Sequence, residues 1–217
     1  MNDRVWTVNP EDVVNIGRFI SSGVFSPQRT IAVSGNAVAN PKYFKTKIGA
    51  ELAPILNTVG IKFYNVRVIN GDVLTGSTAL ISDHLGYFNN LVTVIPEGSH
   101  YRMFGWLPFK DNKILSLSNT SLSRLFNRKG FEVDTNLNGE ERALVVTGEM
   151  EKVFPMDIYP MQLLKACMAE DIEKMEALGI YEVIPEDFGL IDYASTSKIE
   201  AQEIIRGGIE LMRKEVG

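Results

Sequence analysis

The fold is decided by residues 30–69, TIAVSGNAVANPKYFKTKIGAELAPILNTVGIKFYNVRVI. Strand-like alternation, glycine and asparagine turn signals, and a short helical pattern follow one another along this stretch. The predicted elements are a strand, a turn, a strand, a helix and a strand, over residues 30–34, 35–41, 43–48, 50–56 and 64–69. A hairpin, a crossing helix and a returning strand match a β-grasp arrangement. We therefore expect an α+β protein.

A strong helix start lies before this stretch. Asn9 is a favourable N-cap and Pro10 suits the first helical position, while Glu11 and Asp12 complement the positive end of the helix dipole. Apolar residues then recur at helical spacing up to Ser21-Ser22-Gly23: Val13, Ile16 and Ile20. A β-rich run over residues 4–8 precedes the helix, so the two are predicted to form one strand–helix unit of an α/β domain.

The C-terminal third, residues 149–217, predicts a small helical bundle. One helix is expected to begin at Tyr159-Pro160 and to end at Gly179, and its apolar face comprises Leu164, Met168, Ile172 and Met175. A turn is predicted over 184–189. A final amphipathic helix is predicted over 198–214, with Ile205, Ile209 and Met212 on one face. The methionines, including Met161, predict either core filler, which we favour, or a docking patch.

The charge balance gives no reason to expect binding to nucleic acid or to an anionic membrane surface. The formal net charge is −5 at pH 7, whereas such partners reward clustered Lys and Arg. The densest positive cluster, Lys42, Lys45 and Lys47, predicts one polar face of a strand. No apolar run approaches the ~18 to 20 residues that span a bilayer. We therefore expect no transmembrane segment.

Two stretches imitate ligand-binding loops, but each lacks an essential residue. Residues 71–78, GDVLTGST, have the glycine spacing of a phosphate-binding loop, but Ser77 stands where the lysine must be. Residues 134–139, DTNLNG, imitate the first half of a calcium loop, but Val145 stands at the twelfth position, which must supply a carboxylate. We expect neither nucleotide nor calcium binding, and a polar turn between strands at the second stretch.

No constellation of residues predicts catalysis. The two histidines, His84 and His100, lack metal-ligand spacing and stand outside any nucleophile motif. No Gly-x-Gly-x-x-Gly fingerprint occurs, and the acidic residues are dispersed along predicted exposed faces. We predict no catalytic residue and no metal site.

Four stretches, in the expected order, resemble the A subunit of the bacterial Na+-translocating NADH:quinone reductase, a respiratory membrane complex. They are residues 5–17 (VWTVNPEDVVNIG), 31–41 (IAVSGNAVANP), 137–144 (LNGEERAL) and 154–164 (FPMDIYPMQLL). All four matches fall in the C-terminal half of that longer protein. We therefore expect the chain to begin inside a domain.

The resemblance implies three domains. Residues 1–28 are expected to be the C-terminal piece of a Rossmann-like domain whose earlier strands lie outside this chain. Residues 29–148 are expected to form a β-rich domain that contains a ligand-binding β-grasp unit. Residues 149–217 are expected to form a helical domain that resembles a ferredoxin-like region without cluster cysteines.

The cysteine count separates this chain from a related protein. The C subunit of the Rnf electron-transport complex resembles the same C-terminal region and carries two cysteine-rich cluster motifs there. This chain has one cysteine, Cys167, which excludes an internal disulfide and an all-cysteine zinc or iron–sulfur site, because these need two to four thiolates. Cys167 itself is predicted to be a buried or half-buried, inert thiol.

The resemblance also implies a function. The complex oxidises NADH, reduces ubiquinone or a related quinone and pumps Na+, while NADH, the flavins and the iron centre bind to other subunits. This chain is expected to bind no cofactor of its own and to lack catalytic activity when isolated. It is expected at the cytoplasmic face of the bacterial inner membrane, as a peripheral part docked on the membrane-embedded B subunit. The competing hypothesis is a stand-alone β-grasp module that binds a soluble small ligand and takes no part in electron transfer.

An aromatic stretch offers a candidate quinone site. Six aromatic residues are interleaved with glycines: Tyr87, Phe88, Tyr101, Phe104, Trp106 and Phe109. A quinone head group suits planar apolar walls with one or two donors, so Tyr87, Phe104 and Trp106 are the candidate quinone-binding residues. The alternative is that these aromatic side chains fill the core of the β-rich segment or cover a sheet edge.

Overall fold

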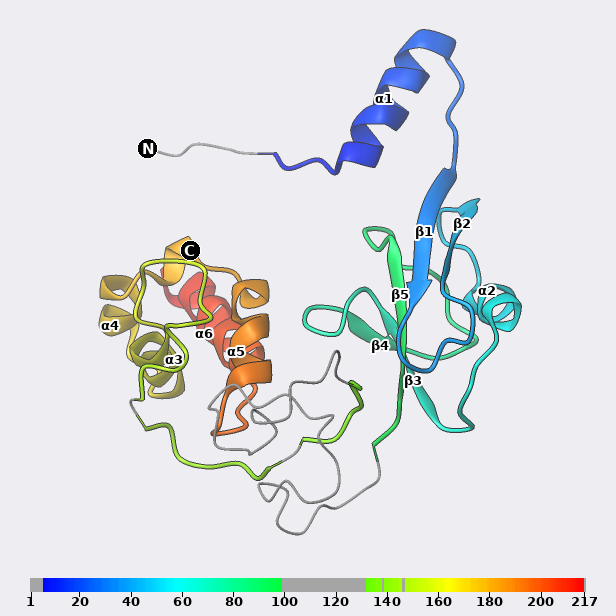
Figure 1. Ribbon diagram of the computed structural model, residues 1–217. Helices are drawn as coiled ribbons and strands as arrows, with labels where there is room; N and C mark the ends of the chain where they lie inside the picture. Colours follow the sequence, from blue (N-terminus) through cyan, green and yellow to red (C-terminus); the bar gives the residue numbers. More distant parts are fainter. Residues whose placement is uncertain (1–5, 99–131, 138, 146, 217) are drawn as a thin grey trace. The chain divides into compact units, whose positions relative to one another are not determined.

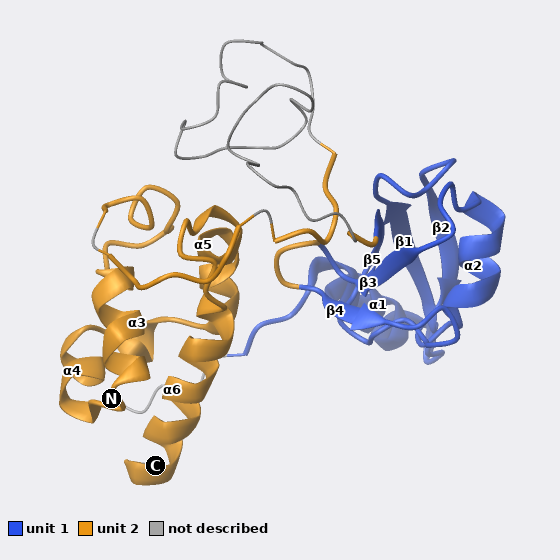
Figure 2. Ribbon diagram, turned by 90° about the horizontal axis from the view of Figure 1, so that it is seen from below, with its two compact units in different colours: residues 1–72, 76–96 blue, residues 73–75, 97–217 orange. Residues whose placement is uncertain are grey.

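The computed structural model describes residues 6–98, 132–137, 139–145 and 147–216 (Figure 1). The chain divides into two compact units, coloured separately in Figure 2. Unit 1 comprises residues 1–72 and 76–96, and unit 2 comprises residues 73–75 and 97–217. Unit 1 holds a sheet and unit 2 holds a group of helices, so the α+β prediction is confirmed.

Unit 1 contains a five-stranded mixed sheet with the order β2-β1-β5-β3-β4 (Figure 1). Its strands are β1 (Gln28–Ser34), β2 (Lys42–Lys47), β3 (Val66–Asn70), β4 (Ser77–Ala79) and β5 (Leu91–Pro96). β1 pairs antiparallel with β2 and parallel with β5, and β3 pairs antiparallel with β5 and β4. The three strands predicted from residues 30–69 are therefore confirmed, whereas β4 and β5 were not predicted.

Helix α2 (Leu52–Val59) supplies the apolar partner of this sheet. Its buried residues are Leu52, Ile55, Leu56 and Val59. They belong to one cluster with the inward side chains of the sheet, among them Ile31, Val33, Val68, Val92 and Val94. The helix begins two residues later than predicted because Glu51, its N-cap residue, has an extended backbone. It ends at Gly60, whose amide donates to the carbonyl of Leu56.

The lysines of β2 lie on an edge strand. Lys42, Lys45 and Lys47 are exposed, and strand alternation places Lys42 on the opposite face from the other two. The prediction of one polar face is therefore wrong, although all three lysines are exposed on the strand as a polar cluster should be. Lysines along a sheet edge discourage pairing with another chain, because such pairing would bury their charges.

Helix α1 (Pro10–Ser22) begins and ends where the sequence predicts. Asn9 is its N-cap residue, and Gly23 closes it in the left-handed conformation, with φ of 69°. None of its residues is buried. The predicted strand over residues 4–8 is wrong for Trp6–Val8, which have no regular structure. A strand needs a neighbour to pair with, and the described strands pair among themselves.

Unit 2 is built from short helices around one longer helix. The elements are α3 (Pro160–Met168), α4 (Ile172–Ala177), η2 (Ile180–Glu182), η3 (Pro185–Phe188), α5 (Gly189–Ala194) and α6 (Ala201–Glu215). α6 packs against α3, α5 and η3. Ile205 and Met212 of α6 are buried, and Ile209 packs against the same core, so the predicted apolar face is confirmed. The turn predicted over 184–189 is the 3-10 helix η3, and the chain continues directly into α5.

The single helix predicted from Pro160 to Gly179 is wrong, because residues 169–171 interrupt it. The amide of Asp171 donates to the carbonyl of Ala166, and the amide of Glu170 donates to that of Cys167. With Glu170 at φ of 53°, this is a Schellman ending. Asp171 then caps α4 by accepting from the amide of Lys174 at 3.1 Å.

The interruption redistributes the methionines. Met161, Met175 and Met212 are buried in the core of unit 2, as core filler should be. Met168 is 60% exposed at the end of α3, so it does not continue the predicted apolar face.

Cys167 is buried against α6, as predicted. Burial raises the pKa of the Cys167 thiol to about 11, which keeps it protonated and unreactive at neutral pH. A Cβ atom added at Gly208 of α6 would lie 2.6 Å from the Cys167 Sγ and 3.3 Å from the Met175 Sδ. The glycine therefore permits the close approach of α6 to α3.

A half-buried carboxylate lies at the start of α6. Asp192 of α5 accepts from the backbone amide of Ala201 and from the Gln202 Nε2 at 2.8 Å. Burial raises the pKa of Asp192. The same Gln202 Nε2 donates to the carbonyl of Leu74 at 2.8 Å. The segment 73–75 is thereby held by α6, which explains why it belongs to unit 2.

The Schellman ending predicts that Glu170→Gly stabilises unit 2. Glycine takes the left-handed conformation without the Cβ clash that Glu170 incurs, so we expect the free energy of unfolding to rise by about 0.5–1 kcal/mol. The matched control is Glu173→Gly in α4, which should lower it by about 1 kcal/mol. Urea unfolding followed by circular dichroism measures both. Equal losses in the two variants would show that residue 170 is not held in this conformation.

The contact between Gly208 and Cys167 predicts opposite effects at neighbouring glycines. Gly208→Ala should lower the free energy of unfolding by about 1–3 kcal/mol, because the added methyl group overpacks the core. Gly207 has nothing within 4 Å of an added Cβ, so Gly207→Ala should raise it by about 0.5–1 kcal/mol through helix propensity. Thermal and urea unfolding of both variants provide the measurement. A neutral Gly208→Ala would contradict the close packing of α6 on α3.

Candidate ligand-binding and docking surface

The candidate quinone-binding residues are only partly placed by the structure. Tyr87 lies in the described part of the chain, in the connection from β4 to β5. Phe104 and Trp106 lie outside the described residues, as do Tyr101 and Phe109. Of the six aromatic residues of this stretch, the described ones are Tyr87 and Phe88, and the structure brings these two together.

Tyr87 and Phe88 form an exposed aromatic pair on a tight turn. We call residues 86–89 the aromatic turn. It is closed by a hydrogen bond from the amide of Asn89 to the carbonyl of Gly86 at 3.1 Å. The rings are 4.9 Å apart between centroids and meet edge to face at 82°. Tyr87 is 55% exposed and Phe88 74%, so neither ring fills the core as the alternative supposed.

A buried arginine lies beneath Tyr87. Arg29, at the start of β1, is 4% exposed. Its guanidinium carbon lies 5.4 Å from the centroid of the Tyr87 ring, within the range of a cation–π interaction. Its Nη1 donates to the carbonyl oxygen of Tyr87. Both the ring and the backbone of Tyr87 are thus oriented by one side chain.

The same guanidinium binds the first turn of α1. Its Nη2 donates to the Asp12 Oδ1 at 3.2 Å, and its Nε lies 3.6 Å from the Glu11 Oε2. The other Glu11 oxygen, Oε1, accepts from the amide of Thr30 at 2.9 Å. Two carboxylates compensate the buried positive charge, as a charge removed from water requires. These contacts fasten the N-terminal turn of α1 to the beginning of β1.

Sequence reasoning assigned no role to Arg29, although the strand pattern contains a signal for it. Arg29 is in phase with Ile31 and Val33, the inward residues of β1. A charged residue on the inward phase of a strand must find a partner. The adjacent acids Glu11 and Asp12 were interpreted only as helix-dipole partners, and their second role depends on tertiary structure.

The apolar side of α1 is exposed in unit 1. Its exposed apolar residues are Val13, Val14, Ile16, Phe19 and Ile20, between 50% and 78% exposed. Trp6 and Val8 before the helix, and Val24 and Phe25 after it, are exposed as well. Contiguous exposed apolar surface of this kind marks an interaction site.

The two loops that imitate ligand sites have other structures. Residues 71–78 lead into strand β4, whereas a phosphate-binding loop leads into a helix. The Asp134 carboxylate accepts from the amide and the side chain of Asn136, at 3.0 Å and 2.9 Å, which forms a local polar turn. It does not lie between strands as predicted, because residues 132–137 and 139–145 contain none.

The described residues show no metal-binding group. Among them, no three His, Cys, Asp or Glu side chains are placed to hold a metal ion. The carbonyl of His84 accepts from the Asn70 side chain at 3.0 Å. His100 lies outside the described residues.

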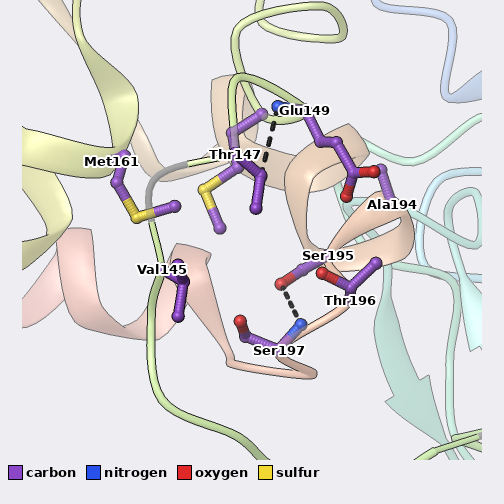
Figure 3. A pocket seen from close by; sticks show the side chains of 9 residues that line it. Val145, Thr147, Glu149, Met161, Ala194, Ser195, Thr196 and Ser197 are labelled. Atoms are coloured by element: carbon purple, nitrogen blue, oxygen red, sulfur yellow. Dashed lines mark hydrogen bonds between the residues drawn. The ribbon is translucent and has the colours of Figure 1, made fainter. Parts of the chain in front are cut away.

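A small cavity in unit 2 is too small for a quinone. Its volume is about 10 Å³, enough for one water molecule. The residues around it are shown in Figure 3: Val145, Thr147, Glu149, Met150, Met161, Ala194, Ser195, Thr196 and Ser197. The Ser195 Oγ accepts from the amide of Ser197 at 3.2 Å, and the Ser197 Oγ donates to the carbonyl of Ala143 at 3.2 Å. The first of these hydrogen bonds closes a local turn, and the second joins that turn to the segment that contains Ala143.

No helix within the described ranges is long and apolar enough to cross a membrane.

Comparison with known proteins gives matches to one protein, the A subunit of the Na(+)-translocating NADH-quinone reductase. A family model described as the NQRA C-terminal domain matches residues 30–80, which contain most of β1 and all of β2, α2, β3 and β4. The chain is 35% identical over 215 residues to the A subunit of the Na(+)-translocating NADH-quinone reductase of Neisseria meningitidis serogroup B, covering 99% of this chain and 48% of that protein. It is 39% identical over 213 residues to the protein of the same name from Hahella chejuensis, covering 97% of this chain and 47% of that protein. The chain thus spans about half the length of these relatives.

Proposed function

Because the chain is homologous to the C-terminal half of the A subunit of the Na+-translocating NADH-quinone reductase, we propose that it is a peripheral part of such a respiratory complex. The observation that carries this proposal is the similarity along 99% of the chain, which includes both units. In this proposal the chain works at the cytoplasmic face of the bacterial inner membrane and docks on the membrane-embedded B subunit. NADH oxidation, the flavins and the iron centre belong to other subunits.

The three-domain organisation belongs to the same proposal. For residues 29–148, the mixed sheet with β1 parallel to β5 and a helix on one face supports a β-grasp ligand-binding unit. For residues 1–28, the uncovered apolar side of α1 supports a piece of a Rossmann-like domain completed elsewhere. Residues 149–217 are then the helical domain that corresponds to a ferredoxin-like region and works without cluster cysteines.

Within this complex we propose that the chain contributes scaffold, docking surface and part of a quinone site. The exposed pair of Tyr87 and Phe88 offers planar apolar surface to a quinone ring, and the Tyr87 hydroxyl offers a donor to a quinone carbonyl. Arg29 holds Tyr87 in place from below. Phe104 and Trp106 remain proposed members of the site. The chain itself transfers no electrons in this proposal, since no redox group is assigned to it.

The quinone proposal predicts a saturable response at the aromatic turn. Titration of the 217-residue chain with a short-chain soluble quinone, followed by amide NMR shifts, should move the signals of Tyr87, Phe88 and Asn89. Phe88→Ala should weaken binding by about two- to tenfold, because stacking on an aromatic side chain contributes roughly 0.5–1.5 kcal/mol. Tyr43→Ala, at an exposed tyrosine of edge strand β2, is the matched control. Equal weakening by both variants, or linear shifts without saturation, would contradict a site at this turn.

The docking proposal predicts co-purification with a membrane partner. When the chain is co-produced with the B subunit of a relative's complex, the tagged B subunit in detergent should retain it. Phe19→Glu and Ile20→Glu in α1 test whether the apolar side of the helix contributes. A chain that stays alone in the soluble fraction, while the B subunit is extracted intact, would favour the stand-alone ligand-binding module instead.

A further inference from the structure

We propose that Arg29 is a positioning residue that couples helix α1 to the aromatic turn, so that a change at one of them is transmitted to the other. The assumption that a quinone is the ligand at the aromatic turn rests on the function proposed above. The coupling itself rests on the contacts of Arg29 in β1, which join α1 to the connection between β4 and β5.

The geometry of the guanidinium makes the two contacts interdependent. One nitrogen, Nη1, donates to the carbonyl of Tyr87, and the other, Nη2, donates to the Asp12 Oδ1 at 3.2 Å. The group is planar and rigid, so the directions of these bonds are fixed relative to each other. Movement of either acceptor must break a bond to a buried charge or rotate the group away from its other partner.

Helix α1 depends on this contact because it lacks an apolar anchor. None of its residues is buried. Glu11 and Asp12 bind Arg29, and Glu11 also binds the amide of Thr30. A helix held through its first turn changes orientation readily when that turn shifts. The orientation of its uncovered apolar side is therefore set by Arg29.

The aromatic turn depends on the same contact from the other side. The Tyr87 ring lies 5.4 Å from the guanidinium carbon on one side, while more than half of the side chain faces solvent. A planar ligand on the exposed ring must either preserve this arrangement or disturb it. Because coupling free energies are reciprocal, a partner that reorients α1 and thereby changes ligand affinity at the turn will have its own affinity changed by the ligand by the same factor.

The coupling is tested in the full chain without ligand, using variants at each end. Tyr87→Ala removes the ring over Arg29 and should speed amide hydrogen exchange in α1 by about tenfold, as expected for loss of a partly buried cation–π contact. Glu11→Gln with Asp12→Asn should shift the amide NMR signals of the aromatic turn, although neither residue contacts its side chains. Arg29→Lys keeps the charge but cannot make both contacts, so it should produce both effects.

Two controls separate coupling from general loosening. Lys42→Met removes a cation–π contact of 5.0 Å with Phe44 on the same sheet and should leave α1 exchange unchanged. Slow exchange of the β5 amides in every variant shows that the sheet remains folded. Changes confined to the element that carries each substitution, with β5 protected, would overturn the coupling.

A separate titration distinguishes this inference from the proposed function. If the ligand-free variants show the coupling but the soluble quinone moves no signals, the quinone site fails and the coupling stands. If quinone binds with the same affinity in the wild-type chain and in the Glu11→Gln, Asp12→Asn variant, the coupling fails and the quinone site stands.

Discussion

The parallel pairing of β1 with β5 is the constraint on which unit 1 depends. Residues 32–34 pair with residues 91–93, and Ile31, Val33, Val92 and Val94 around this contact are almost fully buried. Parallel neighbours cannot be joined by a tight turn. The chain between them therefore forms β2, α2, β3 and β4, and α2 covers the apolar face that the pairing creates. Such long-range pairing loses chain entropy when the loop closes, and the burial of the completed core offsets this loss.

Sequence reasoning in this chain is accurate where an element depends on residues close in the sequence, and it fails where the element depends on distant ones. The local signals at β1, α1 and α2 are strong, since alternation, a proline at the helix start and a terminal glycine each act within a few residues. Strand β5 was missed because LVTVIP is apolar almost throughout, and period-2 alternation does not apply to a strand buried on both faces. The break after α3 was missed because Glu170 occupies a position where glycine is the usual signal.

The candidate site also depends on contacts between residues that are distant in the sequence. The sequence could identify Tyr87 as one of a group of aromatic residues, but its exposure and its orientation depend on Arg29, which lies 58 positions earlier. Arg29 in turn needs Glu11 and Asp12, whose positions at a helix start already had a local explanation. The second role of such a residue is difficult to predict, because the local role at the helix start already explains why an acidic residue stands there. Homology supplied what local patterns could not, since it rests on the order of residues along the whole chain.

The segment 73–75 has a consequence for dissecting this molecule. It leaves unit 1 between β3 and β4 and is held in unit 2 by Gln202, while Gly189 of α5 leaves room for it, since an added Cβ would lie 3.2 Å from the Leu74 Cβ. The polypeptide therefore passes between the units three times, after residues 72, 75 and 96. After a proteolytic nick near residue 96, non-covalent contacts of segment 73–75, such as the hydrogen bond from Gln202 to the carbonyl of Leu74, would still hold the two fragments together. A gene fragment that ends at residue 96 would encode segment 73–75 without the helix α6 that holds it. Using either unit alone, in evolution or in engineering, therefore requires a new β3–β4 connection.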